Sequence, residues 1–261
     1  MKDDIVWITG ASSGIGEALH YEMNRLGYRT IISSRRKEAL LHVRQNSAHP
    51  EKVAVLPMDI SMTDRSENHV KEALALFGRV DILVNNAGIS QRSLISNTQF
   101  KVFKQLMDVN YLGTISLSNA LLPYFVAQKK GHFVVVTSLM GKFGSPYRSG
   151  YCGSKHALHG YFDVLRMEHE KDHVSVTLIC PGFVRTQVAM NALTGDGSPQ
   201  NADDEATANG ISVSDCAKKM ARAIQRKKWE VHIGGRETIG IYLKRFFPKL
   251  LHKLVVKSKV R

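Results

Sequence analysis

The sequence predicts a single α/β domain built on a doubly wound parallel sheet with helices on both faces. Short apolar segments alternate with amphipathic helical segments along most of the 261 residues, as parallel strands joined by crossover helices do. The apolar segments lack a polar–apolar alternation, which indicates strands buried on both faces. A glycine-rich turn, Gly10 to Gly16, lies between the first strand and the first helix. The length fits one such domain with a large core.

The elements follow one another in regular order. Strands are predicted over 4–9, 29–33, 52–56, 81–84, 131–138, 174–180 and 229–233. Helices are predicted from the glycine turn to about residue 26, over 37–47, up to 76, twice within 97–128, and over 150–171 and 213–227. Ser61 or Thr63 is expected to cap the helix that ends near 76. Asn110 falls in the second helix of 97–128 or at its start, where an asparagine usually has a local reason.

Composition and charge exclude several classes of protein. Hydrophobic residues at 43% and charged residues at 23% are typical of a globular domain. The sequence contains no run of eighteen apolar residues, and the acidic start before the first strand argues against a signal peptide, so we expect a cytoplasmic location. Cys152, Cys180 and Cys216 lie far apart without a CxxC pair. This spacing predicts reduced thiols, no disulfide framework and no metal site.

The glycine turn has the context of a dinucleotide site, because it joins a strand to a helix. Gly10 permits the tight turn, Gly14 lets the backbone approach a pyrophosphate, and Gly16 allows close packing of helix and strand. The free N–H groups of the helix then face the phosphates. The spacing GxxxGxG differs from both GxGxxG and the P-loop, and a purely structural turn is the alternative. Expected cofactor contacts here are Gly10, Ser12, Ser13, Gly14, Ile15 and Gly16.

The second strand ends at a pair of arginines, Arg35 and Arg36, about twenty residues beyond the glycine turn. An NAD site usually has an acid here for the ribose hydroxyls, whereas an NADP site uses arginine for the 2′-phosphate. No acid occurs between Glu22 and Glu38. The pair therefore predicts NADP(H) in preference to NAD(H); a solvated helix start is the alternative.

Tyr151 and Lys155 stand four residues apart, on one face of a predicted helix. An ammonium near the phenol would lower its pKa toward the working range of a general acid or base. Ser138, at the end of the strand before that helix, supplies a hydroxyl to hold a substrate oxygen. The YxxxK pattern alone is common, so its meaning depends on the rest of the chain.

Together these residues resemble the short-chain dehydrogenase/reductase family over about residues 4–235. The family's TGxxxGxG matches Thr9 to Gly16, and its NNAG matches Asn85 to Gly88. The remaining matches are the active-site residues Asn110, Ser138, Tyr151 and Lys155 and the turn Pro181, Gly182 with the following Thr186. Residues 151–157 and the tail also look like those of the membrane-associated relatives that handle lipophilic carbonyls.

The resemblance implies a Rossmann-type domain and a role for each matched residue. Tyr151 would be the general acid and base, Lys155 would lower its pKa and bind the nicotinamide ribose, and Ser138 would hold the substrate oxygen beside Tyr151. Asn110 would anchor a water that passes protons toward Lys155. Further cofactor contacts implied are Asp59 and Ile60 at the adenine, Asn86, Ala87 and Gly88 at the crevice, and Pro181, Val184 and Thr186 near the carboxamide. A homodimer or homotetramer is also implied.

We predict a catalytic domain over 1–235 and a basic amphipathic extension over 236–261. Residues 187–211 form a long polar segment, read as a substrate lid, with a disordered surface loop as the alternative. Pro248 predicts two short helices in the extension and opens the second. Its apolar stripe is Ile239, Leu243, Phe246, Leu250 and Leu254, flanked by lysines and arginines. Such a segment suits an anionic membrane surface; a cover over the pocket or a subunit contact is the alternative. No nucleic-acid motif is recognisable.

The sequence thus predicts an NADP(H)-dependent oxidoreductase that interconverts a ketone or aldehyde and an alcohol. Residues near 90–94, 140–147 and 187–211 are expected to form the substrate walls. Phe143, Tyr147, Phe183 and Met190 favour a lipophilic carbonyl. The alternative from another class is an NADP(H)-binding regulator or scaffold without catalysis.

Overall fold

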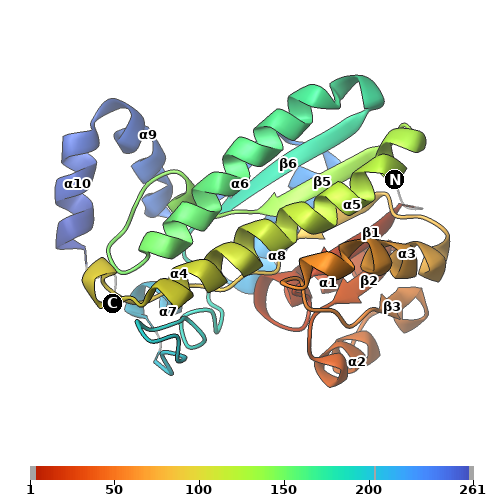
Figure 1. Cartoon of the computed structure of the whole chain (residues 1–261), viewed down its shortest axis with the longest axis horizontal. Helices are drawn as coiled ribbons and strands as arrows, with labels where there is room; N and C mark the ends of the chain where they lie inside the picture. The colour runs from red at the N-terminus through yellow and green to blue at the C-terminus, as the bar shows by residue number, and fades with distance from the viewer. Residues whose placement is uncertain (1–3, 203, 259–261) are drawn as a thin grey trace.

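A computed structural model describes residues 4–202 and 204–258, so the outermost residues of the two predicted regions and residue 203 of the 187–211 segment lie outside it. Within these residues, seven parallel strands form one sheet in the order β3-β2-β1-β4-β5-β6-β7 (Figure 1). The strands are β1 Ile5–Thr9, β2 Arg29–Ser33, β3 Val53–Val55, β4 Ile82–Asn85, β5 Gly131–Val136, β6 Val174–Pro181 and β7 Glu230–Ile233. The predicted doubly wound α/β fold is confirmed.

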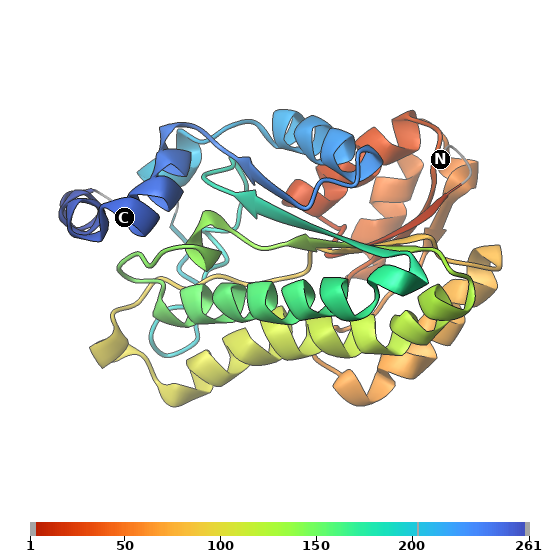
Figure 2. The same ribbon diagram turned by 90° about the horizontal axis from the view of Figure 1, so that it is seen from above.

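Helices cover both faces of the sheet (Figure 2). The helices are α1 Gly14–Arg25, α2 Lys37–Gln45, α3 Ser66–Phe77, α4 Phe100–Met107, α5 Gly113–Ala127, α6 Ser149–Glu168, α7 Glu205–Ala208, α8 Val213–Gln225, α9 Ile239–Phe246 and α10 Pro248–Lys257. Single 3₁₀ turns are Pro50–Lys52, Thr63–Arg65, Ile95–Asn97, Leu139–Gly141, Glu170–Asp172 and Arg236–Thr238.

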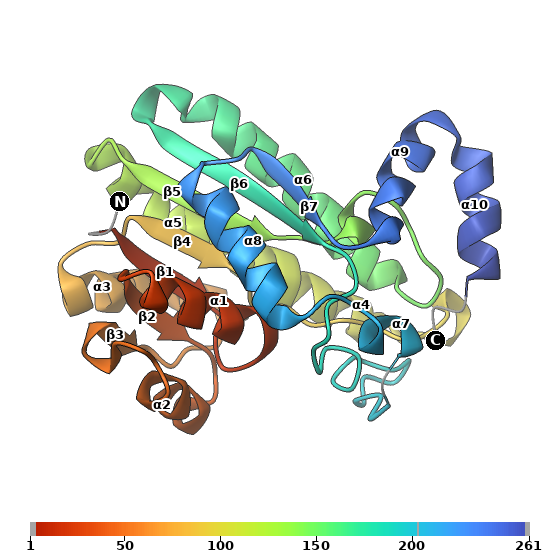
Figure 3. The same cartoon turned by 180° about the vertical axis from the view of Figure 1, so that it is seen from behind.

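One hydrophobic core lies between the sheet and α1, α2 and α8, with α1 beside α8 (Figure 3). The other lies under α3, α5 and α6.

Two helices, α4 and α5, lie within the segment 97–128 as predicted, but Asn110 lies between them rather than in the second. α4 continues through a π turn, Asp108–Leu112, directly into α5, and the Gly113 N–H closes that turn on the Asp108 carbonyl. A Cβ on Gly113 would lie 2.3 Å from the Ile60 carbonyl oxygen, so the helix passes this loop at a distance that only glycine allows. Asn110 lies inside the π turn, a kind of local widening that is frequent at functional sites.

The predicted cap on α3 is wrong. The 3₁₀ turn Thr63–Arg65 precedes α3, and neither Ser61 nor Thr63 caps the helix through its side chain. The reason is that Ser61 turns back: its N–H and its hydroxyl both donate to Asp59 Oδ1, at 2.9 and 2.7 Å.

The 187–211 segment is packed on the domain rather than looped into solvent. Leu193 N donates to the Ser90 carbonyl at 2.9 Å, and Arg92 N donates to the Leu193 carbonyl at 2.8 Å. The Leu193 side chain packs on Val102 and Leu106 of α4. Its role as a lid stays a prediction.

The extension forms two short helices, α9 and α10, and Pro248 is the first residue of the second, as the sequence predicts. Leu251 is buried with Leu139, Phe143 and Cys180, so α10 packs on the domain. The predicted stripe does not pack as one face: Leu243 is half-buried, whereas Phe246 is 68% exposed. None of the helices in the described part of the chain combines the length and the apolarity needed to cross a bilayer.

Candidate active site

A cavity of about 1430 Å³ opens at the carboxyl ends of the strands. β1 lies between β2 and β4, so the connections diverge there and leave a crevice, as expected at the switch point of a doubly wound sheet. The glycine turn lines one wall, and the segments after β5 and β6 line the other. α9 and α10 reach the same cavity at its far end.

Two glycines of the turn adopt left-handed backbone conformations, with φ of 66° at Gly10 and 62° at Gly14, which other residues rarely adopt. Gly16 has a different role, because it does not line the cavity among the described residues. A Cβ there would lie 2.4 Å from Asn86 Nδ2 and 2.5 Å from the Gly10 carbonyl oxygen. Gly16 therefore lets the start of α1 pack directly on the turns that follow β1 and β4.

Thr9 joins those two turns. Its hydroxyl accepts hydrogen bonds from Asn86 N at 3.0 Å and Ala87 N at 3.1 Å, and it donates to the Val84 carbonyl at 3.2 Å. The Asn86 side chain donates to the Thr9 and Gly10 carbonyls. Asn86 is thus committed to shaping the turn, while residues 86–88 line the cavity.

The arginine pair lies at the β2 end of the cavity. Arg36 Nη2 donates to Ser12 Oγ at 3.3 Å, so the guanidinium reaches from the end of β2 to the glycine turn. Arg35, Asp59 and Ile60 line the same region. The predicted contacts Ser13, Ile15, Pro181, Val184 and Thr186 line the cavity as well. A methyl group of Thr186 lies across the crevice, 3.5 Å from where a Gly14 Cβ would stand.

Ser138, Tyr151 and Lys155 meet on one wall. Ser138 follows β5, and its hydroxyl accepts from Met140 N at 3.1 Å and donates to the Pro181 carbonyl at 3.4 Å. Tyr151 and Lys155 lie on the first turns of α6. Lys155 Nζ donates to the Val136 carbonyl at 2.8 Å and lies 5.8 Å from the centre of the Tyr151 ring. Burial lowers the pKa of Lys155 to about 8.

Asn110 stands behind this wall and does not line the cavity among the described residues. It is fully buried. Its Oδ1 accepts from Ile89 N at 2.8 Å, and its Nδ2 donates to the Ile89 carbonyl at 3.0 Å and to Ser154 Oγ at 2.9 Å. The side chain therefore ties the π turn to the loop after β4 and to α6.

The surroundings of the Tyr151 phenol shift its pKa in opposite directions. Burial raises its pKa above the ordinary value, and a hydrogen bond with Ser138 opposes that rise. The cations that also lower it are Arg92 and Arg148. The expectation that Lys155 lowers the pKa of Tyr151 stays a prediction, since the Lys155 ammonium is turned to a backbone carbonyl.

Arg92 and Arg148 are cavity residues that the sequence analysis did not single out. Both are buried and share one carboxylate, because Asp204 Oδ2 accepts from Arg92 Nη2 at 2.5 Å and from Arg148 Nη2 at 3.1 Å. Asp204 belongs to the 187–211 segment, so this cluster fastens that segment beside Tyr151. The sequence indicates this cluster only weakly, through an arginine within 90–94 and an acidic run at 203–205.

The far end of the cavity is apolar. Phe143 and Phe183 line it as expected, whereas Tyr147 and Met190 are not among the described lining residues. Tyr147 has a left-handed backbone conformation (φ 66°), and Met190 is 36% exposed. Their place is taken by residues of the extension, Leu243, Leu251, Leu254 and Val255.

This combination of fold and site defines an oxidoreductase of the nucleotide-binding α/β class. A sequence profile described as short chain dehydrogenase matches residues 4–196. The chain therefore belongs to the short-chain dehydrogenase/reductase family, as its motifs indicate.

Individual relatives agree with that assignment. The human dehydrogenase/reductase SDR family member 7 is 38% identical over 255 residues, covering 95% of this chain and 75% of the relative. A Burkholderia phymatum short chain dehydrogenase/reductase, solved in complex with NAD, has a TM-score of 0.83 at 22% identity and covers 95% of both chains. The structure of ElxO with NADP bound has a TM-score of 0.75 at 22% identity, covering 88% of this chain and 97% of that one.

Proposed function

We propose that this chain is an NADP(H)-dependent oxidoreductase that interconverts a lipophilic ketone or aldehyde and its alcohol, with Tyr151 as general acid and base. The observation that carries the proposal is the meeting of Ser138, Tyr151 and Lys155 in the cavity that the glycine turn also lines. The site fits a dinucleotide because Ser13, the residue before α1, makes no side-chain cap, which leaves the first N–H groups of the helix for phosphate oxygens.

In this proposal each catalytic residue has one task. Ser138 holds the substrate oxygen, and Tyr151 gives its proton to that oxygen in reduction or takes it in oxidation. Lys155 orients the ribose and carries the positive charge beside the phenol. The Asn110 side chain already forms hydrogen bonds with Ile89 and Ser154. In this proposal the main chain of Asn110 therefore binds the water that relays protons. The bound nicotinamide supplies the hydride chemistry.

The arginine pair supports NADP(H). The relatives of known structure carry NAD in one case and NADP in another, so the fold accepts both. Here the Arg36 guanidinium and the Ser12 hydroxyl lie side by side at 3.3 Å, and both groups favour a phosphate rather than a ribose hydroxyl.

We expect NADPH to bind at least about ten-fold more tightly than NADH, a difference of about 1.4 kcal/mol. A fluorescence titration of the full chain with each nucleotide measures it without a substrate. The double variant Arg35→Ala/Arg36→Ala should lose this preference by weakening NADPH alone. Arg44→Ala is the matched control, since Arg44 lies on α2 outside the cavity and donates to the Pro50 carbonyl. Equal affinities in the parent chain would overturn the cofactor assignment.

The substrate class follows from the far end of the cavity. Leu243, Leu251 and Leu254 of the extension face a region that also holds Leu139 and Phe143, so the substrate would contact mainly carbon. We propose a lipophilic carbonyl on this ground. If NADPH binds tightly but no carbonyl of a broad panel is reduced, the scaffold reading replaces the enzymatic one.

We also propose that the extension touches an anionic membrane surface. Its outer side exposes large apolar residues, Tyr242, Phe246, Phe247 and Val256, among lysines and arginines, which suits the boundary between headgroups and acyl chains. The cytoplasmic location and the homodimer or homotetramer stay predictions.

Vesicles of an anionic lipid test the membrane contact. We expect the full chain to co-sediment with them and the variant Phe246→Ser/Phe247→Ser to do so far less. Leu112→Ser/Met167→Ser, which changes exposed apolar residues elsewhere, is the control. Equal partitioning of all three chains would reject the membrane contact.

A further inference from the structure

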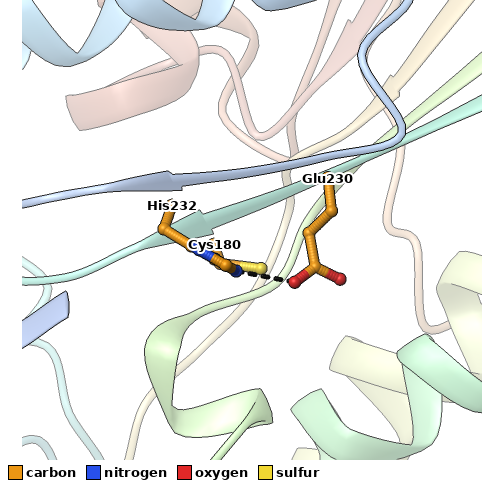
Figure 4. Close-up of side chains that lie close together, drawn as sticks. All are labelled: Cys180, Glu230 and His232. Carbon is orange, nitrogen blue, oxygen red and sulfur yellow. Dashed lines mark hydrogen bonds and ion pairs between the residues drawn. The ribbon is translucent and has the colours of Figure 1, made fainter. Parts of the chain in front are cut away.

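Three side chains that could hold a metal ion gather on β6 and β7, outside the cavity. Cys180, Glu230 and His232 each present a ligand atom, and these atoms all lie within 4.8 Å of one another (Figure 4). Two strands place them: Cys180 pairs in register with His232, and Glu230 stands two residues before His232, so its side chain points to the same face of the sheet. Because these residues lie on two strands that are far apart in the sequence, the spacing of the cysteines does not indicate this site.

The neighbours of this cluster favour a cation. His159 of α6 lies beside it, with Nε2 3.9 Å from Cys180 Sγ and Nδ1 3.7 Å from Glu230 Oε2. His159 Nδ1 is buried without a hydrogen-bond partner among the described residues. The Lys142 ammonium lies 2.6 Å from Glu230 Oε2, so this carboxylate already pairs with a cation, and a metal ion would compete with Lys142 for it.

We propose that Cys180, Glu230 and His232 form a binding site for a soft divalent cation of the zinc class. A thiolate, an imidazole and a carboxylate are the donors that Zn²⁺ takes in proteins, at distances that need a contraction of the cluster by about an ångström. Water or His159 completes a four-coordinate site. The Cys180 thiol releases its proton to solvent when the metal binds, because a coordinating thiol is deprotonated.

The surroundings show how an ion would reach the site and what it would do there. Cys180 is fully buried, whereas His232 and Glu230 are about a quarter to a third exposed on the edge strand β7, so an ion can approach from the sheet edge. The Thr137 hydroxyl donates to Cys180 Sγ at 3.2 Å, one residue before Ser138. A bound ion would tie β7 to β6 directly behind the wall that carries Ser138.

Cobalt binding to the full chain, stripped with a chelator, tests the proposal. Co²⁺ should give the absorption of a tetrahedral site together with a sulfur-to-cobalt charge-transfer band, and Zn²⁺ should displace it. Cys180→Ser should lose the charge-transfer band, and His232→Gln should weaken binding by about ten-fold or more. Cys216→Ser is the matched control, because Cys216 is also a buried free thiol but lies on α8. It should bind as the parent chain does.

A second variant separates metal binding from a folding defect. Lys142→Met removes the ammonium that competes for Glu230, so Co²⁺ should bind more tightly than in the parent chain. Far-ultraviolet circular dichroism and NADPH binding check that each variant is folded. The proposal is overturned if the parent chain shows no charge-transfer band, if Cys180→Ser retains it, or if Lys142→Met binds no more tightly.

Discussion

Replacing Tyr151 by phenylalanine is expected to lower kcat by about 10²–10⁴-fold, the range over which a positioned general acid contributes. In the proposed mechanism the phenol is the proton donor beside Ser138, and burial raises its pKa above the ordinary value. The change removes one oxygen atom and leaves the ring, so NADPH affinity should stay as in the parent chain. Steady-state rates with a responsive carbonyl, together with a fluorescence titration of NADPH, measure both quantities.

Tyr161→Phe is the matched control for this variant. Tyr161 lies on the same helix, α6, but its hydroxyl donates to Asn119 Oδ1 outside the cavity. Loss of the Tyr161 hydroxyl should leave kcat unchanged. A Tyr151→Phe chain that turns over as fast as the parent would rule out the proposed proton donor, whereas loss of NADPH binding in that chain would point to a disturbed fold.

Replacing Asp204 by alanine should lower the free energy of unfolding by about 3–5 kcal/mol, because it leaves Arg92 and Arg148 buried without their shared carboxylate. Urea denaturation at neutral pH measures the difference. Asp196→Ala changes an exposed carboxylate of the same segment, whose hydrogen bonds among the described residues go to Thr194 and Ser198, so it should destabilise the protein far less. Equal losses in the free energy of unfolding for the two variants would show that the buried cluster does not hold the 187–211 segment on the domain.

The stability that Asp204 contributes with Arg92 and Arg148 depends on pH. Burial alone raises the pKa of Asp204, but the hydrogen bonds and charge of Arg92, with the charge of Arg148, outweigh it, so the pKa lies below the ordinary carboxyl value. A lowered folded-state pKa stabilises the protein above the unfolded-state value, about 3.9, and the stabilisation is lost as the pH falls through the folded-state value. The difference in the free energy of unfolding between the parent chain and Asp204→Ala should therefore become smaller at acidic pH.

The features predictable from sequence are those encoded locally. Each strand and helix carries its own apolar pattern. The residues within the glycine turn lie close together in the sequence, as do those within YxxxK, so both motifs could be recognised and placed at the cavity. The π turn could not, because it depends on Gly113 meeting the Ile60 carbonyl from another element. The α3 cap failed for a similar reason: Ser61 has a competing partner in Asp59.

Contacts between residues that are distant in the sequence also limited the prediction of the site. Arg92 and Asp204 stand 112 residues apart in sequence, and nothing near either residue indicates the other. The cysteine spacing argued against a metal, yet Cys180 and His232 become neighbours only through the pairing of β6 with β7. Tyr147 and Met190 were expected in the substrate wall on residue type alone, and neither is among the described residues that line the cavity.

The cavity draws its lining from Thr9 near one end of the chain to Ser258 near the other. During synthesis the glycine turn and the strands that carry it emerge first, but the apolar end of the chamber exists only after α10 has been made and has docked on Phe143 and Leu139. We therefore expect a chain without α10 to keep the end of the cavity that the glycine turn lines but to leave its apolar end open. Proteolysis within the last helix would return a finished molecule to that state, with an open chamber and an otherwise intact sheet.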